Sequence, residues 1–275
     1  MHDYELDTRP VDAVLIGAQL AYGSTGNNIT IRFLERSGFR AVQVPTALLS
    51  NLPLYPSSAG GELPDGYLSG ILEELLRREV LATARYIVVG YLGNARQAEI
   101  LGAWYRKARE QYPQLRLIVD PDIGDAEEGL HADPAVVQSY IEHLLPLAWL
   151  MTPNLFELGV MAEETVEDEE QILQAAYEVI DAGVPNLIVT SVPGDTPELI
   201  GTLLATEDEQ VEQVDTLRVE TSAKGAGACL LGALVVELLH GTGLTESMAQ
   251  AVIATTQVLA GEDSDFAPHA TNRWR

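Results

Sequence analysis

Lysine and cysteine are scarce in this chain of 275 residues. It contains one cysteine, Cys229, and two lysines, Lys107 and Lys224. The single cysteine excludes an intramolecular disulfide and a metal site built from several cysteines. The 16 Lys and Arg residues stand against 41 Asp and Glu, which gives a formal net charge of −25. Nucleic acid and anionic membrane surfaces require a basic footprint on the protein, so we expect neither as a partner.

Long hydrophobic runs are also missing. No stretch reaches the ~18 to 20 apolar residues that span a bilayer. Residues 1–7 are acidic, whereas a signal peptide begins with basic residues. These absences predict a soluble, cytoplasmic protein. The chain length and an apolar content of 47% allow a large core, and no repeat or linker divides the sequence. We therefore expect a single domain over residues 1–275.

Short apolar runs alternate with helical patterns along most of the chain. The runs are typical of buried strands in a parallel sheet, and lie at residues 13–18, 41–44, 86–90, 115–120, 148–152 and 186–190. Helical patterns between them include residues 71–78, 97–111, 136–145 and 169–182. After Pro193 the pattern predicts two antiparallel strands, 198–206 and 210–219, and then helices 227–240 and 245–260. This order predicts an α/β fold, doubly wound, with a mostly parallel central sheet and helices on both faces.

Polar and glycine-rich segments follow the predicted strands. They lie at residues 22–28, 90–94, 120–125, 152–157, 190–191 and 225–228. Sheets of this kind bind ligands beyond the carboxyl ends of their strands. The segment 221–228 contains Gly225, Ala226 and Gly227 directly before an apolar helix, a pattern that suits backbone N–H groups around an oxyanion. A tight loop packed close to a neighbouring strand explains the same residues, and the motif alone favours that alternative.

These segments together resemble the pyridoxal kinases of the ribokinase-like superfamily, from about Ala13 to about Ala260. The resemblance is carried by Tyr22-Gly23 with Gly26-Asn27, Ser50-Asn51 with Tyr55, Gly90-Tyr91-Leu92-Gly93, Asp120-Pro121, and Thr152-Pro153-Asn154 with Glu157. In that family ATP phosphorylates the 5′-hydroxymethyl group of a pyridine ring. The resemblance thus implies ATP and Mg²⁺ as cofactors, a small heterocyclic alcohol as substrate, and a homodimer.

The resemblance also assigns roles to individual residues. It implies a ring site made by Ala18, Tyr22, Ser50, Asn51, Tyr55 and Tyr91. It implies nucleotide binding by Asp120, Asn154, Thr190, Ser191 and Gly227. Asp120, Asn154 and Glu157 are expected to organise Mg²⁺ through waters. Gly225, Ala226 and Gly227 are expected to form the anion hole, and residues 124–129 a loop over the phosphates.

Simpler explanations exist for some of these residues. Asn154 followed three residues later by Glu157 is also the pattern of a helix capping box, which is compatible with a metal role. Thr190 and Ser191 are common residues where a strand ends in a turn.

The sequence departs from the family at several of these positions. The family loop reads Gly-x-Gly-Asp, and its aspartate takes the proton of the substrate hydroxyl; Ala228 occupies that place here. At the ring site the family commonly has a serine where this chain has Ala18. Beside Ser50 and Asn51 the family has polar residues where this chain has Leu48 and Leu52. Loss of a general base costs ~10² to 10⁴ in rate, so weak phosphoryl transfer can survive. The neighbouring thiol of Cys229 is expected to be buried and inert.

Three hypotheses follow. The first is an ATP- and Mg²⁺-dependent kinase of pyridoxal or a related hydroxymethyl heterocycle. The second is a pseudokinase that binds nucleotide or a vitamer without turnover, and Ala228 is the residue that separates these two. The third keeps the fold but changes the acceptor to a sugar or a hydroxymethylpyrimidine. The segments around Tyr22 and Tyr91 argue against the third hypothesis.

Overall fold

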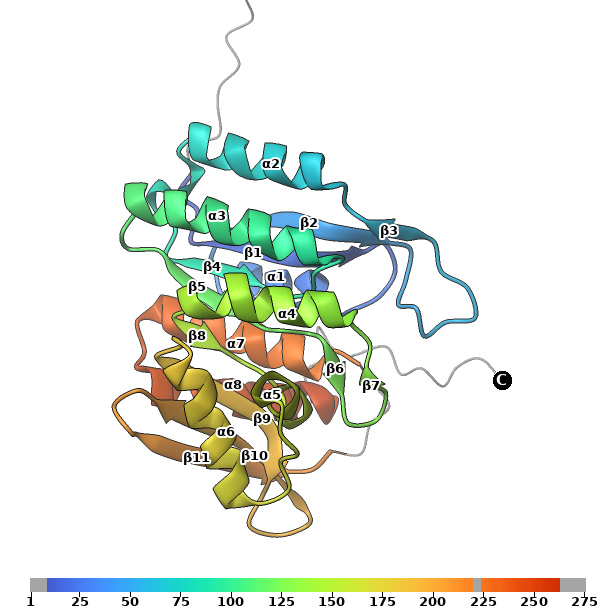
Figure 1. Cartoon of the computed structure of the whole chain (residues 1–275), viewed down its shortest axis with the longest axis vertical. Coiled ribbons are helices and arrows are strands. Elements are labelled where there is room, and N and C mark those ends of the chain that lie inside the picture. Colours follow the sequence, from blue (N-terminus) through green and yellow to red (C-terminus); the bar gives the residue numbers. More distant parts are fainter. Residues whose placement is uncertain (1–8, 220–223, 263–275) are drawn as a thin grey trace, which may run out of the picture.

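A nine-stranded sheet forms the centre of the protein (Figure 1). The computed structural model describes residues 9–219 and 224–262. From one edge to the other the strands are β11 (Val211–Leu217), β10 (Leu199–Thr206), β9 (Asn186–Pro193), β8 (Leu150–Met151), β5 (Arg116–Val119), β4 (Tyr86–Val89), β1 (Ala13–Leu20), β2 (Ala41–Leu49) and β3 (Gly60–Glu62). The strands from β9 to β2 pair in parallel, whereas β10, β11 and β3 pair antiparallel. The prediction of a mostly parallel sheet is confirmed, including the antiparallel pair after Pro193.

Helices cover both faces of this sheet (Figure 1). One layer contains α2 (Asp65–Arg77), α3 (Ala95–Gln111), α4 (Pro134–His143), α5 (Leu155–Ala162) and α6 (Glu169–Asp181). The other layer contains α1 (Asn27–Arg36), α7 (Ala226–His240) and α8 (Leu244–Leu259). Two single 3₁₀ turns, Val80–Ala82 and Leu145–Leu147, complete the connections. The doubly wound architecture predicted from the alternating pattern is therefore confirmed.

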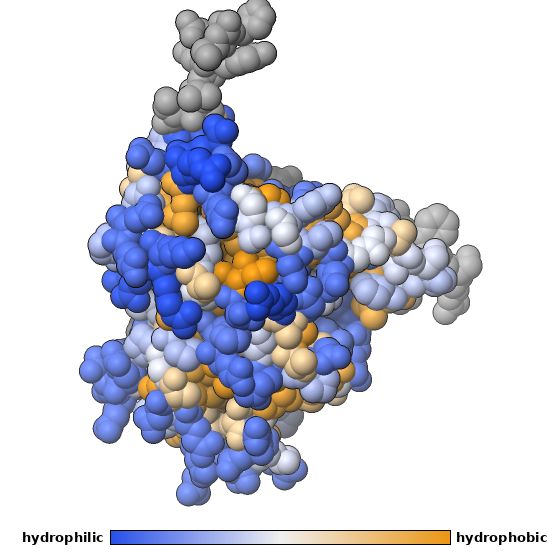
Figure 2. Space-filling view, turned by 45° about the horizontal axis from the view of Figure 1, so that its top comes forward, coloured by the Kyte–Doolittle hydropathy of each residue, from blue (hydrophilic) through white to orange (hydrophobic). Residues whose placement is uncertain are grey.

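Two hydrophobic cores explain why the apolar runs form strands. In β1, Val14 and Ile16 pack into the core under α2 to α6, whereas Ala13 and Leu15 pack into the core under α1, α7 and α8. Successive side chains of a strand point to opposite faces, so a strand buried on both faces reads as a continuous apolar run. The surplus of charge remains outside, and hydrophilic residues cover most of the face in Figure 2.

Two strand pairs were not predicted. β2 continues past residue 44 to Leu49 and pairs with β3, where a Cβ on Gly60 would lie 2.0 Å from the carbonyl oxygen of Leu48. Only glycine permits that approach, at a φ of +106°. The predicted loop 124–129 forms a small hairpin of β6 (Gly124–Asp125) and β7 (Gly129–Leu130). None of the described helices is both long enough and apolar enough to span a membrane.

Candidate active site

A cavity of about 1100 Å³ lies where β9 ends and α7 begins. Its lining includes Asn154, Thr190, Ser191, Ala226 and Gly227. The structure therefore brings together residues from three distant segments that the sequence predicted to bind nucleotide. Thr190 is joined to the α5 segment directly, because its N–H donates to the carbonyl of Pro153 at 2.9 Å.

The start of α7 has the form expected of an anion cradle. Its N-cap is Gly225, which has no side chain, and among residues 9–219 and 224–262 no side chain accepts from the first backbone N–H groups of the helix. A Cβ on Gly225 would lie 2.8 Å from the carbonyl oxygen of Ser24, and its φ is +111°. A Cβ on Gly227 would meet no atom within 4 Å. Gly225 is thus required by packing against the loop after β1, whereas Gly227 leaves open space toward the cavity. Thr221 to Ala223, which precede this cradle, lie outside the described residues.

Ala228 and Cys229 are buried against apolar side chains. Ala228 is 8% exposed and belongs to a small cluster with Ile29, Cys229 and Val258. Its carbonyl oxygen accepts a hydrogen bond from Thr30 Oγ1 at 3.4 Å. Burial raises the pKa of the Cys229 thiol to about 12. The thiol remains protonated at neutral pH and cannot replace a missing carboxylate as a base, as the sequence predicted.

A carboxylate cluster follows β5 and β8. Thr152 Oγ1 donates to Asp120 Oδ1 at 3.0 Å. Glu157 Oε1 accepts from the N–H of Ile123 at 2.8 Å, and Glu157 Oε2 accepts from the N–H of Asn154 at 2.9 Å. The Asn154 side chain accepts from Glu157 N at 2.9 Å, which completes the capping box of α5. The capping explanation is therefore correct, and Glu157 additionally fixes the segment after Asp120.

Burial and neighbouring negative charge raise the pKa of Asp120 and of Glu157. Burial raises the pKa of Asp120 to about 7, and the negative charge of Asp122 adds to this effect. Burial raises the pKa of Glu157 to about 8, again reinforced by Asp120 and Asp122. Like charges in a poorly solvated site disfavour ionisation, so a cation near this cluster would stabilise the ionised forms.

The donor set of this cluster fits a hydrated divalent cation rather than a protein cage. Among the described residues, no group of three or more His, Cys, Asp or Glu is arranged to hold a metal ion. Within the same ranges, Thr152 is the only side chain that donates to the Asp120 carboxylate. Mg²⁺ is usually bound through one or two carboxylates, several waters and substrate phosphates. Asp120 with Glu157 behind it meets that description.

The predicted ring-site residues gather around the ends of β1 and β2. The rings of Tyr22 and Tyr55 meet edge to face with centroids 6.2 Å apart. The N–H of Tyr22 donates to the carbonyl of Ser50 at 2.9 Å. Ser50 Oγ donates to Asn51 Oδ1 at 2.6 Å, and Asn51 Nδ2 donates to the carbonyl of Ser57 at 2.9 Å. Ser50 and Asn51 thus use their side chains to shape their own loop.

The remaining ring-site positions lie beside this group. Ala18 lies at an irregularity of the β1–β2 register, and Leu48 is 47% exposed, while Leu52 is half-buried. Tyr91 is anchored through its carbonyl, which accepts from Thr46 Oγ1 at 2.6 Å. Burial, and then the charges of Asp122 and Glu62, raise the pKa of the Tyr91 phenol. Tyr91 therefore lies close enough to the carboxylate cluster to respond to its charge.

Lys224 is a functional candidate that the motif analysis did not assign. It lines the cavity directly before Gly225, and its Nζ lies 2.8 Å from Glu128 Oε1 and 3.2 Å from Asp125 Oδ2. Burial opposes its charge, but these two carboxylates outweigh burial and raise the pKa of Lys224. Lys224 thereby ties the β6–β7 hairpin to the cradle. In the sequence, its position beside Gly225 and Gly227, in a chain with only two lysines, could have indicated this role.

Comparisons with known proteins agree with this geometry. The chain matches the Phosphomethylpyrimidine kinase family over residues 78–269. It is 37% identical to the pyridoxine/pyridoxal/pyridoxamine kinase of Bordetella avium over 94% of this chain and 88% of that protein. Its fold superimposes on pyridoxal kinase from Entamoeba histolytica with a TM-score of 0.88, at 19% identity, covering 96% of this chain and 94% of that one. Pyridoxal kinase from Leishmania donovani, in complex with ADP and pyridoxamine, gives a TM-score of 0.83 at 23% identity over 90% and 85% of the two chains.

The sheet order, the uncapped start of α7 and the structural likeness define a ribokinase-like kinase fold. Within that class the sequence identity is more specific. The chain belongs to the pyridoxine/pyridoxal/pyridoxamine kinase family of ATP-dependent kinases.

Proposed function

We propose that the protein transfers the γ-phosphoryl group of ATP to the 5′-hydroxymethyl group of pyridoxal or a related heterocyclic alcohol. The observation that carries this proposal is the cavity that joins Thr190 and Ser191 to the open start of α7 at Gly227. The loop carrying Tyr22 reaches the same place, because Ser24 packs against Gly225. The names of its relatives support the acceptor, since one acts on vitamin B6 forms and another was solved with ADP and pyridoxamine.

The chain's own groups provide positioning and charge stabilisation for this transfer. The first backbone N–H groups of α7 donate hydrogen bonds to the phosphoryl oxygens, and the hydroxyls of Thr190 and Ser191 bind the nucleotide phosphates. The substrate oxygen forms a bond to the γ-phosphorus while the bond to ADP breaks. The hydroxyl proton finds no acceptor at Ala228 and passes to water or to phosphoryl oxygen. We therefore propose a slow enzyme, because a missing base costs ~10² to 10⁴ in rate.

Mg²⁺ belongs to this proposal. Asp120 would hold the ion through waters, with Glu157 and Asn154 fixing the segment around it. When bound, the ion supplies neutralisation of phosphate charge. The raised pKa values of Asp120 and Glu157 support a cation here, since a positive charge would relieve their repulsion.

A nucleotide-binding pseudokinase is the alternative from another class. The observation that favours it is the packing of Ala228 with Ile29 and Val258, which puts apolar atoms where the family has its base. A phosphomethylpyrimidine-type acceptor is a further alternative, supported by the family match over residues 78–269.

We also infer a single domain, a cytoplasmic location and a homodimer. The nine-stranded sheet, which extends without a break from β11 at one edge to β3 at the other, supports the single domain. The homodimer rests on the family resemblance, and light scattering of the purified protein tests it through the molar mass.

ATP consumption over a panel of acceptors tests the proposed function. The panel contains pyridoxal, pyridoxine, pyridoxamine and hydroxymethylpyrimidine, each assayed with and without Mg²⁺. We expect Mg²⁺-dependent formation of a phosphorylated vitamin B6 form above the rate without acceptor. A higher rate with hydroxymethylpyrimidine than with the vitamin B6 forms would support the phosphomethylpyrimidine-type acceptor. Nucleotide binding without any phosphorylated product supports the pseudokinase.

A further inference from the structure

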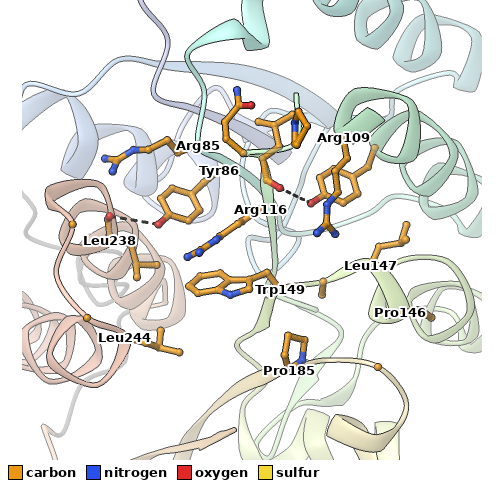
Figure 3. A pocket seen from close by; sticks show the side chains of 18 of the residues that line it. Arg85, Tyr86, Arg109, Arg116, Pro146, Leu147, Trp149, Pro185, Leu238 and Leu244 are labelled. Carbon is orange, nitrogen blue, oxygen red and sulfur yellow. Dashed lines mark hydrogen bonds between the residues drawn. The ribbon is translucent and has the colours of Figure 1, made fainter. Parts of the chain in front are cut away.

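A second cavity, of about 870 Å³, lies at the opposite end of the central strands from the candidate active site, and Figure 3 shows its lining. Tyr86 and Arg116 begin β4 and β5, and Trp149 directly precedes β8, so all three lie at amino ends of strands. The loop between α7 and α8 closes one side of the cavity with Gly243 and Leu244. No part of the proposed kinase reaction uses this cavity.

The charge of the lining is unusual for this chain. Arg85, Arg109 and Arg116 line the cavity, and no Asp or Glu does. The rest of the protein is strongly acidic, with a formal net charge of −25. In residues 9–219 and 224–262, none of these three arginines has a carboxylate within ion-pair distance, in contrast to Arg77, which pairs with Glu74. The cavity is therefore a local concentration of uncompensated positive charge.

The arginines lie against aromatic rings that hold them in place. The guanidinium carbon of Arg116 is 4.5 Å from the centroid of the Trp149 ring. The ring centroids of Tyr86 and Trp149 are 6.1 Å apart, and Figure 3 shows the Arg116 side chain beside both rings. Arg85 donates to the carbonyl of Leu239 at the end of α7. Arg109 lies beside the hydroxyl of Tyr105, where its charge lowers the phenol pKa against the larger effect of burial. A guanidinium stacked on a ring keeps its N–H edge available for an anion.

The start of α8 adds further positive potential. Gly243 is the N-cap of this 16-residue helix, and no side chain caps it. Both Gly243 and Leu244 line the cavity. The first backbone N–H groups and the helix dipole favour negative charge at this point, and the exposed Glu246 in the first turn offsets only part of that potential. The arginines and this helix start belong to separate elements and meet in one cavity.

We propose that this cavity is a second ligand site, for a small aromatic phosphate ester. The aromatic ring of the ligand would lie beside Trp149, and its phosphate would contact Arg109, Arg116 and the first turn of α8. Arginine suits such a ligand because its planar group both stacks on rings and donates two parallel hydrogen bonds to phosphate. The proposal does not depend on the proposed kinase function.

Calorimetric titration with phenyl phosphate tests the site. We expect one phenyl phosphate per chain, and inorganic phosphate to bind at least ~10-fold more weakly because it lacks the ring. Arg109→Gln and Arg116→Gln should each weaken phenyl phosphate binding by ~10-fold or more. Arg77→Gln, which removes an exposed arginine of α2 instead, should leave the affinity unchanged. Trp149→Leu should reduce the preference for phenyl phosphate over inorganic phosphate.

Three results would overturn the proposal. The first is the absence of phenyl phosphate binding to the folded wild-type chain. The second is equal binding by wild type and Arg109→Gln, which would place any bound phenyl phosphate elsewhere, including the candidate active site. The third is equal affinity for phenyl phosphate and inorganic phosphate. Arg109 is exposed on α3, so its substitution keeps the test valid even where a variant at Trp149 or Arg116 fails to fold.

Discussion

Two buried carboxylates distinguish the candidate site at the residue scale. Asp120 has a pKa of about 7 and Glu157 a pKa of about 8, against ordinary values of 3.8 and 4.5. Burial is the main cause of both shifts; the charge of Asp122 adds to the shift of Asp120, and the charges of Asp120 and Asp122 add to that of Glu157. A site that raises the pKa of two neighbouring acids is suited to a cation or to proton transfer, and structural networks can have the same effect.

These shifts predict how stability depends on pH. The folded protein binds protons on Asp120 and Glu157 at pH values where the unfolded chain has already released them. Their contribution to the free energy of unfolding is therefore full below the ordinary pKa values and is lost as pH rises through about 7 and about 8. We expect the melting temperature to fall as pH rises from the ordinary pKa values of these groups to about 8. Mg²⁺ should offset part of this fall.

Asp120→Asn isolates this effect from the other acidic residues. Asparagine keeps an oxygen that accepts from Thr152, but it does not titrate. The melting temperature of the variant should fall less steeply with pH than that of the wild type, as measured by circular dichroism. Asp181→Asn, on the exposed end of α6, is the matched control and should keep the wild-type slope. Equal slopes for all three proteins would show that Asp120 titrates as in the unfolded chain.

At the scale of elements, we propose that the first turn of α7 serves phosphate binding at the expense of helix stability. Glycine is a poor helix residue, and Gly227 lies inside the helix at a position where a Cβ would meet no atom within 4 Å. A structural role alone does not require glycine there. The open space that its missing side chain leaves is consistent with a ligand close to the backbone.

Gly227→Ala should separate these two roles. We expect the melting temperature to rise, by an amount corresponding to at most ~1 kcal/mol, because alanine favours the helix. Nucleotide affinity should fall by ~10-fold, because the new methyl occupies the cradle. Calorimetry with an ATP analogue and thermal unfolding measure the two effects. Unchanged nucleotide affinity would mean that no phosphate approaches this turn.

The β6–β7 hairpin and the cradle form a second pair of elements, joined by Lys224. Lys224→Gln removes its contacts with Asp125 and Glu128. These groups are partly exposed, so global stability should change by less than ~1 kcal/mol. We expect faster hydrogen exchange in the hairpin and ~10-fold weaker nucleotide binding, because a cation beside the phosphates is lost. Lys107→Gln on α3 is the control. If Lys224→Gln and Lys107→Gln show the same hydrogen exchange in the hairpin and the same nucleotide affinity, Lys224 does not have this role.

For the whole molecule, the sequence predicted the features that depend on neighbouring residues, such as buried strands and helix caps. The apolar runs located the strands because side chains such as Val14 and Leu15 are buried on both faces of the sheet. The spacing of Asn154 and Glu157 indicated a capping box because its hydrogen bonds join residues three apart.

Features that need distant partners could not be predicted. The Lys224–Asp125 pair joins residues 99 apart. The arginine-lined cavity collects side chains from several strands and loops. The burial of Ala228 against Ile29 and Val258 depends on how α7 packs on α1 and α8. The sequence pattern therefore indicates the elements and the family, but not the hairpin contact, the second cavity or the apolar surroundings of Ala228.

We propose that this chain keeps the phosphate and ring sites of a pyridoxal kinase but lacks its proton acceptor. The rate of pyridoxal phosphorylation by wild type and by Ala228→Asp tests it most directly, once calorimetry has shown that both proteins bind nucleotide and pyridoxal. Ala228→Asp places a carboxylate at the start of α7, where the helix dipole favours its ionised form. We predict a gain of ~10²-fold or more in product formation. Binding of both ligands without any gain in Ala228→Asp would show that a missing base is not what limits phosphorylation by this chain.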